Sequence, residues 1–208
     1  FNFLSIDLNS GLLSYISLVL LTTLVTGIIN FINFMDGVDG IIGSCLIPWL
    51  ISLSIISSSN IYIAFSLSIF GFLLWNWQPS KIFMGDVGSM FIGSFIAIST
   101  LQFESYSNFT TLLMIISPLI FDPFTCLITR YSFGHNIFSA HRLHLYQRLV
   151  QNGLEHWQIS LIYCLTVCLL SFSYFIGGFK ILTILSSSLF IIFVYFSILH
   201  KSFFKKIT

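Results

Sequence analysis

Long apolar runs separated by short polar connections are the feature that most constrains how this chain folds. A helix that crosses a bilayer needs about 20 predominantly apolar residues, and slightly fewer inside a bundle. The runs that approach this length cover 11–29, 41–57, 61–75, 88–101, 110–129, 157–176 and 181–199. Only 7% of the residues are charged, whereas a soluble domain has roughly 25%. We therefore expect an all-α, polytopic transmembrane helix bundle with about seven spanning helices and a single domain over 1–208.

The remaining composition excludes other classes of protein. A formal net charge of +1 provides no overall field to hold nucleic acid, and a disordered tail would need the opposite composition. The four cysteines all lie inside apolar runs and have no metal-ligand spacing. We interpret these cysteines as small core residues.

The distribution of charge predicts which side of the membrane each connection occupies. With seven spans, the connections 30–40, 76–87 and 130–156 and the tail from 200 share one face. Of the Lys and Arg residues, only Lys180 falls on the opposite face. The positive-inside rule therefore assigns the shared face to the cytoplasm.

The first candidate motif is NFINFMDGVDG, in the connection after the first apolar run. Four amide or carboxylate side chains recur there at every third residue: Asn30, Asn33, Asp36 and Asp39. On a helical turn this spacing keeps them on neighbouring faces, and the two glycines allow the backbone to turn. The cluster provides hard oxygen ligands, and the alternative interpretation is a solvated turn between two helices.

The second candidate motif, KIFMGDVGS, places Asp86 between two glycines at the start of a predicted span. The helix that begins here points its unpaired N–H groups at the predicted cytoplasmic face, which favours a diphosphate. Asp86, with Asn33 or Asp36 opposite, has the oxygen ligands that Mg²⁺ prefers beside substrate phosphates. The alternative is that Asp86 caps its own helix.

The third candidate motif, HRLHLYQR, lies in the longest connection. If this segment is helical, one face carries His141, His144 and Arg148, and another carries Arg142 and Tyr146. Arg130 and His135 add donors nearby. These groups suit a phosphate or a sugar, and the alternative is a basic amphipathic helix on anionic lipid.

One ionisable residue, Asp122, lies within a predicted span near its cytoplasmic end. An ionisable group in a span is a functional hypothesis by default. The alternative is that Asp122 caps or pairs locally where Pro123 releases a backbone carbonyl.

With these three ordered motifs, the chain resembles the polyprenyl-phosphate N-acetylhexosamine-1-phosphate transferases of glycosyltransferase family 4. The resemblance covers roughly Asn30 to Arg148 by motif and the other spans by topology. It implies transfer of a sugar-1-phosphate from a UDP-N-acetylhexosamine to a polyprenyl phosphate, usually undecaprenyl phosphate, with release of UMP. Such a reaction initiates the synthesis of cell-envelope polysaccharide or peptidoglycan. The third motif, in its HRxHxYQR form, resembles the motif of the branch that serves surface polysaccharides such as O-antigen.

The resemblance also implies roles for individual residues. The metal ligands would be Asn33 and Asp86, binding Mg²⁺ or alternatively Mn²⁺. The catalytic residues would be Asp36, Asp39, Asp86 and His141. The substrate-binding residues would be Asn30, Lys81, Arg130, Arg142, His144 and Arg148. The expected setting is a multi-pass protein of the inner (plasma) membrane with a cytoplasmic active face, and homodimer formation is left open.

One feature of the family is missing from the sequence. Members carry a further motif with adjacent aspartates upstream of the first motif, and this chain has no Asp-Asp pair. Because the chain begins with Phe1, we expect a fragment that is inactive, or nearly so, on its own. The alternatives are a non-catalytic membrane relative and a transporter of lipid-linked precursors.

Overall fold

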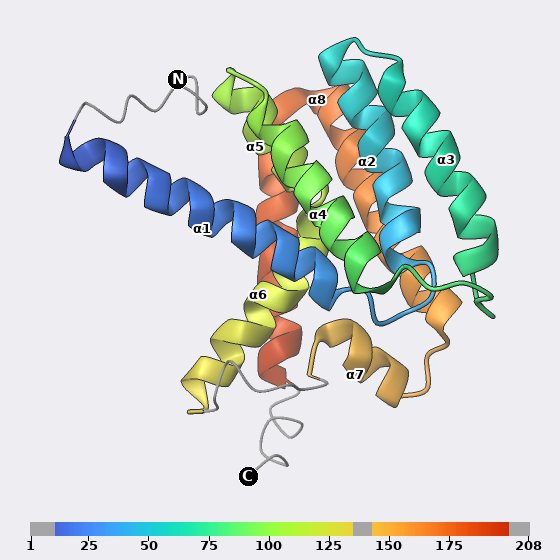
Figure 1. The fold of residues 1–208 in the computed structure, drawn as a ribbon. Helices are drawn as coiled ribbons and strands as arrows, with labels where there is room; N and C mark the ends of the chain where they lie inside the picture. Colours follow the sequence, from blue (N-terminus) through green and yellow to red (C-terminus); the bar gives the residue numbers. More distant parts are fainter. Residues whose placement is uncertain (1–10, 135–142, 200–208) are drawn as a thin grey trace.

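The fold is entirely helical in the part of the chain that the structure, a computed structural model, describes: residues 11–134 and 143–199 (Figure 1). The helices are α1 (Leu12–Phe34), α2 (Ile41–Ser57), α3 (Ile61–Asn76), α4 (Gly85–Leu101), α5 (Tyr106–Ile115), α6 (Ser117–Ser132), α7 (Leu145–Gln151) and α8 (His156–Leu199). The predicted all-α class is confirmed.

The 44 residues of α8 form two helices that lie side by side (Figure 1). Gly178 interrupts the helical backbone with φ 66° and ψ −164°, a conformation that glycine adopts readily. The rings of Tyr163 and Phe193 are 30 residues apart in sequence, yet their centroids are 6.2 Å apart. A continuous helix would separate them by about 45 Å. The first half of α8, before Gly178, therefore packs against the second half, after it.

The helices match the predicted spans with one correction. Among the described residues, α1 and α8 are long and apolar enough to cross a membrane, and α2, α3 and α4 are shorter apolar helices. The single helix predicted over 110–129 is wrong, because α5 and α6 meet at an angle of 74°. Pro118, in the first turn of α6, has no N–H and its ring clashes with a preceding helical turn. How many of the seven runs cross the membrane stays a prediction.

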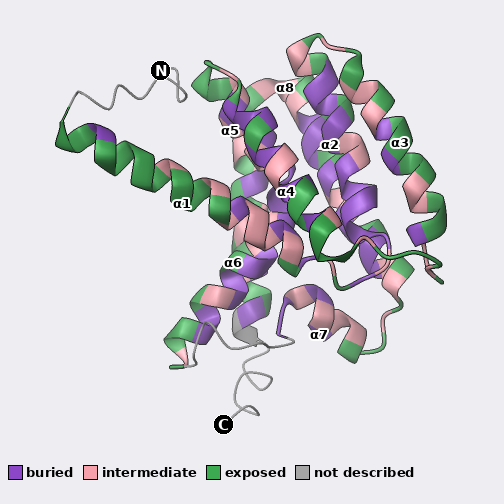
Figure 2. Ribbon diagram, in the orientation of Figure 1, coloured by how far each residue is buried: buried purple, intermediate pink, exposed green. Residues whose placement is uncertain are grey.

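The core is centred where α2 meets α3, the first half of α8 and α5, and it extends to the buried residues of α1 and α4, which pack against each other. Buried residues concentrate on α2, while most of α1 is exposed (Figure 2). Trp49 of α2 is fully buried, and its indole N–H donates a hydrogen bond of 2.9 Å to the Leu112 carbonyl of α5. The exposed faces of α1, α3 and α8 are rich in large apolar side chains, as expected where lipid replaces water.

The polar connections lie together at one end of the bundle, which we call the motif face. It carries the connections 35–40, 77–84 and 143–155, and α1, α3 and α6 end there. Hydrogen bonds link these connections to one another and to the start of α8. The predicted convergence of the loops is confirmed for the described residues, whereas the tail from 200 lies outside them. That the motif face is cytoplasmic stays a prediction.

Candidate active site

The close approach of α1 and α4 brings the first two motifs together. A Cβ atom at Gly93 would lie 2.8 Å from the Cα of Ile29, so only glycine fits at this crossing. One turn closer to the motif face, the Ser89 hydroxyl donates a hydrogen bond of 3.0 Å to Oδ1 of Asn33. The contact holds the Asn33 amide beside the first turn of α4.

The charges of Asp36 and Asp86 interact near the contact between Asn33 and Ser89. The backbone N–H of Gly85 donates a hydrogen bond to the half-buried Asp36 carboxyl group, while Asp86 is exposed. Burial and the negative charge of Asp86 raise the pKa of Asp36 to about 6. We call Asn33, Asp36 and Asp86 the acidic cluster.

The acidic cluster fits the chemistry of a magnesium ion. It offers two carboxylates and one amide oxygen, and no group of three His, Cys, Asp or Glu side chains gathers in the described part of the chain. Mg²⁺ is usually held by one or two carboxylates together with substrate phosphates and water. A bound cation would also relieve the repulsion that raises the pKa of Asp36. The metal assignment of Asn33 and Asp86 stays a proposal.

Asp39 is turned toward the start of α8. Its Oδ2 lies 3.4 Å from Nδ1 of His156 and accepts a hydrogen bond of 3.4 Å from the Ser80 backbone N–H. Its carbonyl oxygen accepts a hydrogen bond of 2.6 Å from the Ser160 hydroxyl. Asp39 therefore joins three segments at the motif face.

Asn76 joins the same connections from the end of α3. Its Oδ1 accepts a hydrogen bond of 3.1 Å from the Gly40 backbone N–H, and its Nδ2 donates one of 2.9 Å to the Ile82 carbonyl. Gly40 has a positive φ of 77°, and a Cβ there would lie 2.9 Å from the Trp77 ring. The turn after α1 therefore depends on both Gly40 and Asn76.

The third motif is only partly helical. α7 begins at Leu145 and His144 precedes it with extended backbone angles, so the predicted helical face shared by His144 and Arg148 is wrong. The side chain of Asp122 in α6 accepts hydrogen bonds from the first two backbone N–H groups of α7. Because these N–H groups have no acceptor within their own helix, this contact allows α7 to start after His144. His141, Arg142 and His135 lie outside the described residues.

His144 is buried in this arrangement. Burial and the charges of Arg130 and Arg148 lower the pKa of His144 to about 4. The imidazole is therefore neutral near pH 7, and its 3.9 Å separation from Oδ1 of Asp122 is not an ion pair there. The ring stacks on Tyr146 with centroids 5.8 Å apart.

Asp122 does not cap its own helix, the local role considered from sequence. Its carboxylate is fully buried and accepts hydrogen bonds from the backbone N–H groups of Leu145 (2.6 Å) and Tyr146 (3.0 Å) and from the hydroxyl of Tyr163 (2.6 Å). Asp122 thereby connects α6, α7 and the first half of α8.

The other predicted substrate contacts lie in different surroundings. Arg148 is buried and donates hydrogen bonds of 3.4 Å each to the Phe196 carbonyl and the Ser197 hydroxyl, in the second half of α8. Arg130 is buried in the last turn of α6. Lys81 is exposed, with Nζ 5.0 Å from the centroid of the Trp75 ring, and Asn30 is half-buried one turn before Asn33. Their substrate roles stay predictions.

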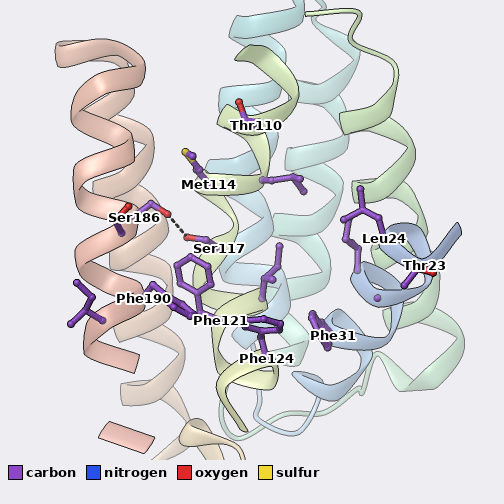
Figure 3. A pocket seen from close by; sticks show the side chains of 16 residues that line it. Thr23, Leu24, Phe31, Thr110, Met114, Ser117, Phe121, Phe124, Ser186 and Phe190 are labelled. Atoms are coloured by element: carbon purple, nitrogen blue, oxygen red, sulfur yellow. Dashed lines mark hydrogen bonds between the residues drawn. The ribbon is translucent and has the colours of Figure 1, made fainter. Parts of the chain in front are cut away.

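An apolar groove of about 870 Å³ opens between α1, the bent pair α5 and α6, and the second half of α8 (Figure 3). Leu24, Met114 and Phe190 line it, and the hydroxyl oxygens of Ser117 and Ser186 lie 3.4 Å apart on its wall. Phe31 and Phe124, with ring centroids 6.4 Å apart, line the end toward the motif face. A smaller cavity of about 420 Å³ lies at the motif face between Gly37, α7 and His156.

Sequence reasoning missed several residues of the site. It did not assign roles to Asn76, Ser89, Tyr146 or His156, and it did not find the groove. A polar residue in the last turn of an apolar run was the available signal for Asn76. The groove has no such signal, because its lining residues resemble those of any spanning helix.

The fold and the site together define a polytopic membrane protein with an oxygen-rich polar site at one end of its helices. The sequence model of glycosyl transferase family 4 matches residues 1–104, which is half of the chain. The chain therefore belongs to glycosyl transferase family 4, and the resemblance inferred from the motifs is confirmed.

Curated relatives carry matching names. A probable undecaprenyl-phosphate N-acetylglucosaminyl 1-phosphate transferase of Bacillus subtilis is 37% identical over 108 residues, covering 49% of this chain and 29% of the relative. A decaprenyl-phosphate N-acetylglucosaminephosphotransferase of Mycobacterium tuberculosis is 31% identical over 117 residues, 49% of the chain and 29% of the relative. A phospho-N-acetylmuramoyl-pentapeptide-transferase of Lactococcus lactis is 30% identical over 112 residues, 50% of the chain and 33% of the relative. The chain thus aligns with about a third or less of each relative.

Proposed function

We propose that the protein containing this chain transfers N-acetylhexosamine-1-phosphate from a UDP-sugar to a polyprenyl phosphate and releases UMP. The observation that carries the proposal is that the acidic cluster and the end of an apolar groove lie at the same end of α1. Phe31 lines the groove, and Asn33, two residues later, points to the other side of the helix, toward Ser89 of α4. A phosphate on a lipid tail in the groove would therefore reach the level of the oxygen ligands at the motif face, across α1 from them.

The groove suits the tail of the acceptor. An isoprenoid chain is apolar along its length, and the groove is lined mainly by aliphatic and aromatic side chains. Among the described residues its lining has no charged side chain. A polar headgroup on its way across the membrane would need polar partners, so this observation favours lipid binding over transport.

The acidic cluster suits the donor. Asn33, Asp36 and Asp86 would hold Mg²⁺, or Mn²⁺ in its place, and the ion would neutralise charge on the diphosphate when bound. After Gly85, whose N–H is bonded to Asp36, the first turn of α4 points further backbone N–H groups to the same end of the helix. The exposed ammonium group of Lys81, which lies over the Trp75 ring, would approach a phosphate from the adjoining connection. Phosphoryl transfer depends chiefly on such positioning and charge neutralisation.

We place the motif face in the cytoplasm and the protein in the inner (plasma) membrane. Lys81, Arg130 and Arg148 lie at the motif face, whereas Lys180 lies next to Gly178 at the opposite end of the bundle. This asymmetry follows the positive-inside rule. A cytoplasmic site also matches the location of UDP-sugars, and the product would serve cell-envelope polysaccharide synthesis.

The test is UMP release from UDP-N-acetylglucosamine by membranes that contain the full-length protein, with undecaprenyl phosphate and Mg²⁺. We expect Asp86→Asn to lower the rate by about 100-fold or more, the scale at which an enzyme loses one group that stabilises transition-state charge. Glu155→Gln, an exposed acid at the same face whose carboxylate accepts from the Trp157 indole, is the matched control. Equal rates for Asp86→Asn and wild type would overturn the assignment.

A further inference from the structure

Asp122 is a buried acid that the proposed mechanism does not use. It lies in α6, away from the acidic cluster, and accepts hydrogen bonds from three donors. Two of the donors are the first N–H groups of α7, which have no acceptor within their own helix. Because α7 has only seven residues, it is too short to be stable without such anchors.

The residue that Asp122 holds also contacts the turn after α1. The Tyr146 backbone N–H is bonded to Asp122, while its hydroxyl donates a hydrogen bond of 2.8 Å to the Phe34 carbonyl. Gln147 donates to the same hydroxyl at 3.1 Å. A Cβ atom on Gly37 would overlap the Tyr146 hydroxyl, so the turn and the side chain fit closely.

The position of this contact connects Asp122 to the acidic cluster. Phe34 is the last residue of α1 and lies between Asn33 and Asp36 in the sequence. Asp122 therefore reaches the turn that carries Asp36 through one residue, Tyr146. At the other end of α7, Arg148 is bonded to the second half of α8, so α7 is held at two points.

We propose that Asp122 is a positioning residue: by holding the first turn of α7, it seats Tyr146 against the end of α1 and fixes the turn that carries Asp36. Its kinetic consequence rests on the proposed function, but its structural consequence does not. The proposal separates Asp122 from residues that only stabilise the bundle, because it predicts a local change at α7 and at Gly37 rather than a uniform loss of stability.

The matched variants are Asp122→Asn and Tyr163→Phe in the full-length protein. Asn has the shape of Asp but replaces one of the two acceptor oxygens by an N–H₂ group, so it can no longer accept from both Leu145 and Tyr146, which donate to different oxygens. Tyr163→Phe removes the third donor to the same carboxylate and leaves both contacts to α7 in place. Tyr146→Phe keeps the backbone bond to Asp122 and removes the hydroxyl contact with Phe34.

The structural readout is hydrogen–deuterium exchange of the protein in lipid nanodiscs. We expect Asp122→Asn to speed exchange at Leu145, Tyr146 and Gly37 by roughly tenfold, the effect of about one lost hydrogen bond. Tyr163→Phe should leave these amides unchanged, and Tyr146→Phe should affect Gly37 alone. Unchanged exchange at Leu145 and Tyr146 in Asp122→Asn would overturn the proposal, whatever its activity.

The kinetic readout is a double-mutant cycle. We expect Asp122→Asn and Tyr146→Phe each to lower kcat roughly tenfold, and the double variant to be no slower than the slower single variant, because both act through one contact. If the fold-losses in kcat of the two single variants multiply in the double variant, the two residues act independently, and the proposed coupling is overturned. If the wild type shows no turnover, the proposed function fails, while the exchange experiment still decides the positioning role.

Discussion

The hydroxyl of Ser89 on α4 donates a hydrogen bond of 3.0 Å to Oδ1 of Asn33 on α1, joining two motifs that are 56 residues apart. The bond orients an amide that carries one of the proposed metal-binding oxygens. Partners of this kind fix the direction of a ligand and tune its affinity for a metal. The same hydroxyl also lies within hydrogen-bonding distance of the Gly85 carbonyl, at 3.1 Å, at the start of α4.

Ser89→Ala should therefore weaken the response to Mg²⁺. We expect the Mg²⁺ concentration for half-maximal UMP release to rise roughly tenfold, the lower end of the effect of losing a partner that orients a ligand. The measurement is a Mg²⁺ titration of UMP release by the full-length protein. Ser94→Ala, on the same helix and half-buried, removes only a bond to the Met90 carbonyl and should not shift the titration. Identical titrations for both variants would contradict the role of Ser89.

Gly93→Ala should destabilise the protein through the crossing of α1 and α4. Its Cβ would lie 2.8 Å from the Ile29 Cα, a backbone atom that cannot move aside cheaply. We expect a loss of about 1–3 kcal/mol, the usual cost of overpacking. Thermal unfolding in detergent measures it. Gly71→Ala on α3, where nothing lies within 4 Å of the added Cβ, should be neutral or stabilising. Equal melting temperatures for the two variants would argue against close packing at Gly93.

The low pKa of His144 predicts a pH dependence of stability. The folded protein holds this pKa at about 4, below the ordinary value of 6.5. Between these values the unfolded chain binds a proton that the folded protein rejects, so stability rises with pH from about 4 to 6.5 and is complete above that range. The contribution is up to about 3 kcal/mol. The free energy of unfolding, measured across this pH range, should rise less steeply with pH in His144→Gln than in the wild type. An unchanged dependence on pH would be evidence against a buried neutral imidazole.

A larger side chain in the groove should raise the KM for the lipid substrate alone. Gly27 lines the groove and has open space where a Cβ would stand. We expect Gly27→Leu to raise the KM for polyprenyl phosphate by about tenfold, the scale of 1.4 kcal/mol of lost binding, with the KM for the UDP-sugar unchanged. Gly71→Leu, also in open space but outside the groove, is the control. A matching rise in the KM for the UDP-sugar would show that the groove does not serve the lipid.

The sequence predicts the helices and the convergence of Asn33, Asp36 and Asp86, because these features follow from apolar run length and from motif spacing along two neighbouring connections. It does not predict the bend between α5 and α6 or the start of α7 at Leu145. The start of α7 depends on Asp122, 23 residues before the N–H group it accepts from. Such long-range contacts leave no periodic signal.

Arg148 illustrates the same limit. The third motif predicts a substrate contact for Arg148, which stays a prediction, but it does not indicate the hydrogen bonds that the guanidinium donates to the Phe196 carbonyl and the Ser197 hydroxyl. The position of the second half of α8 depends on the reversal at Gly178, and the pattern of residues around Arg148 has no information about it.

In the proposed reaction the sugar leaves its donor together with one phosphate. The most direct measurement uses UDP-N-acetylglucosamine with a radioactive β-phosphate, the full-length protein, undecaprenyl phosphate and Mg²⁺, and follows the label between lipid and water. We expect the label to enter the lipid fraction and unlabelled UMP to be released, with both lost in Asp86→Asn. Label that stays in the aqueous fraction as UDP while the sugar enters the lipid would contradict it.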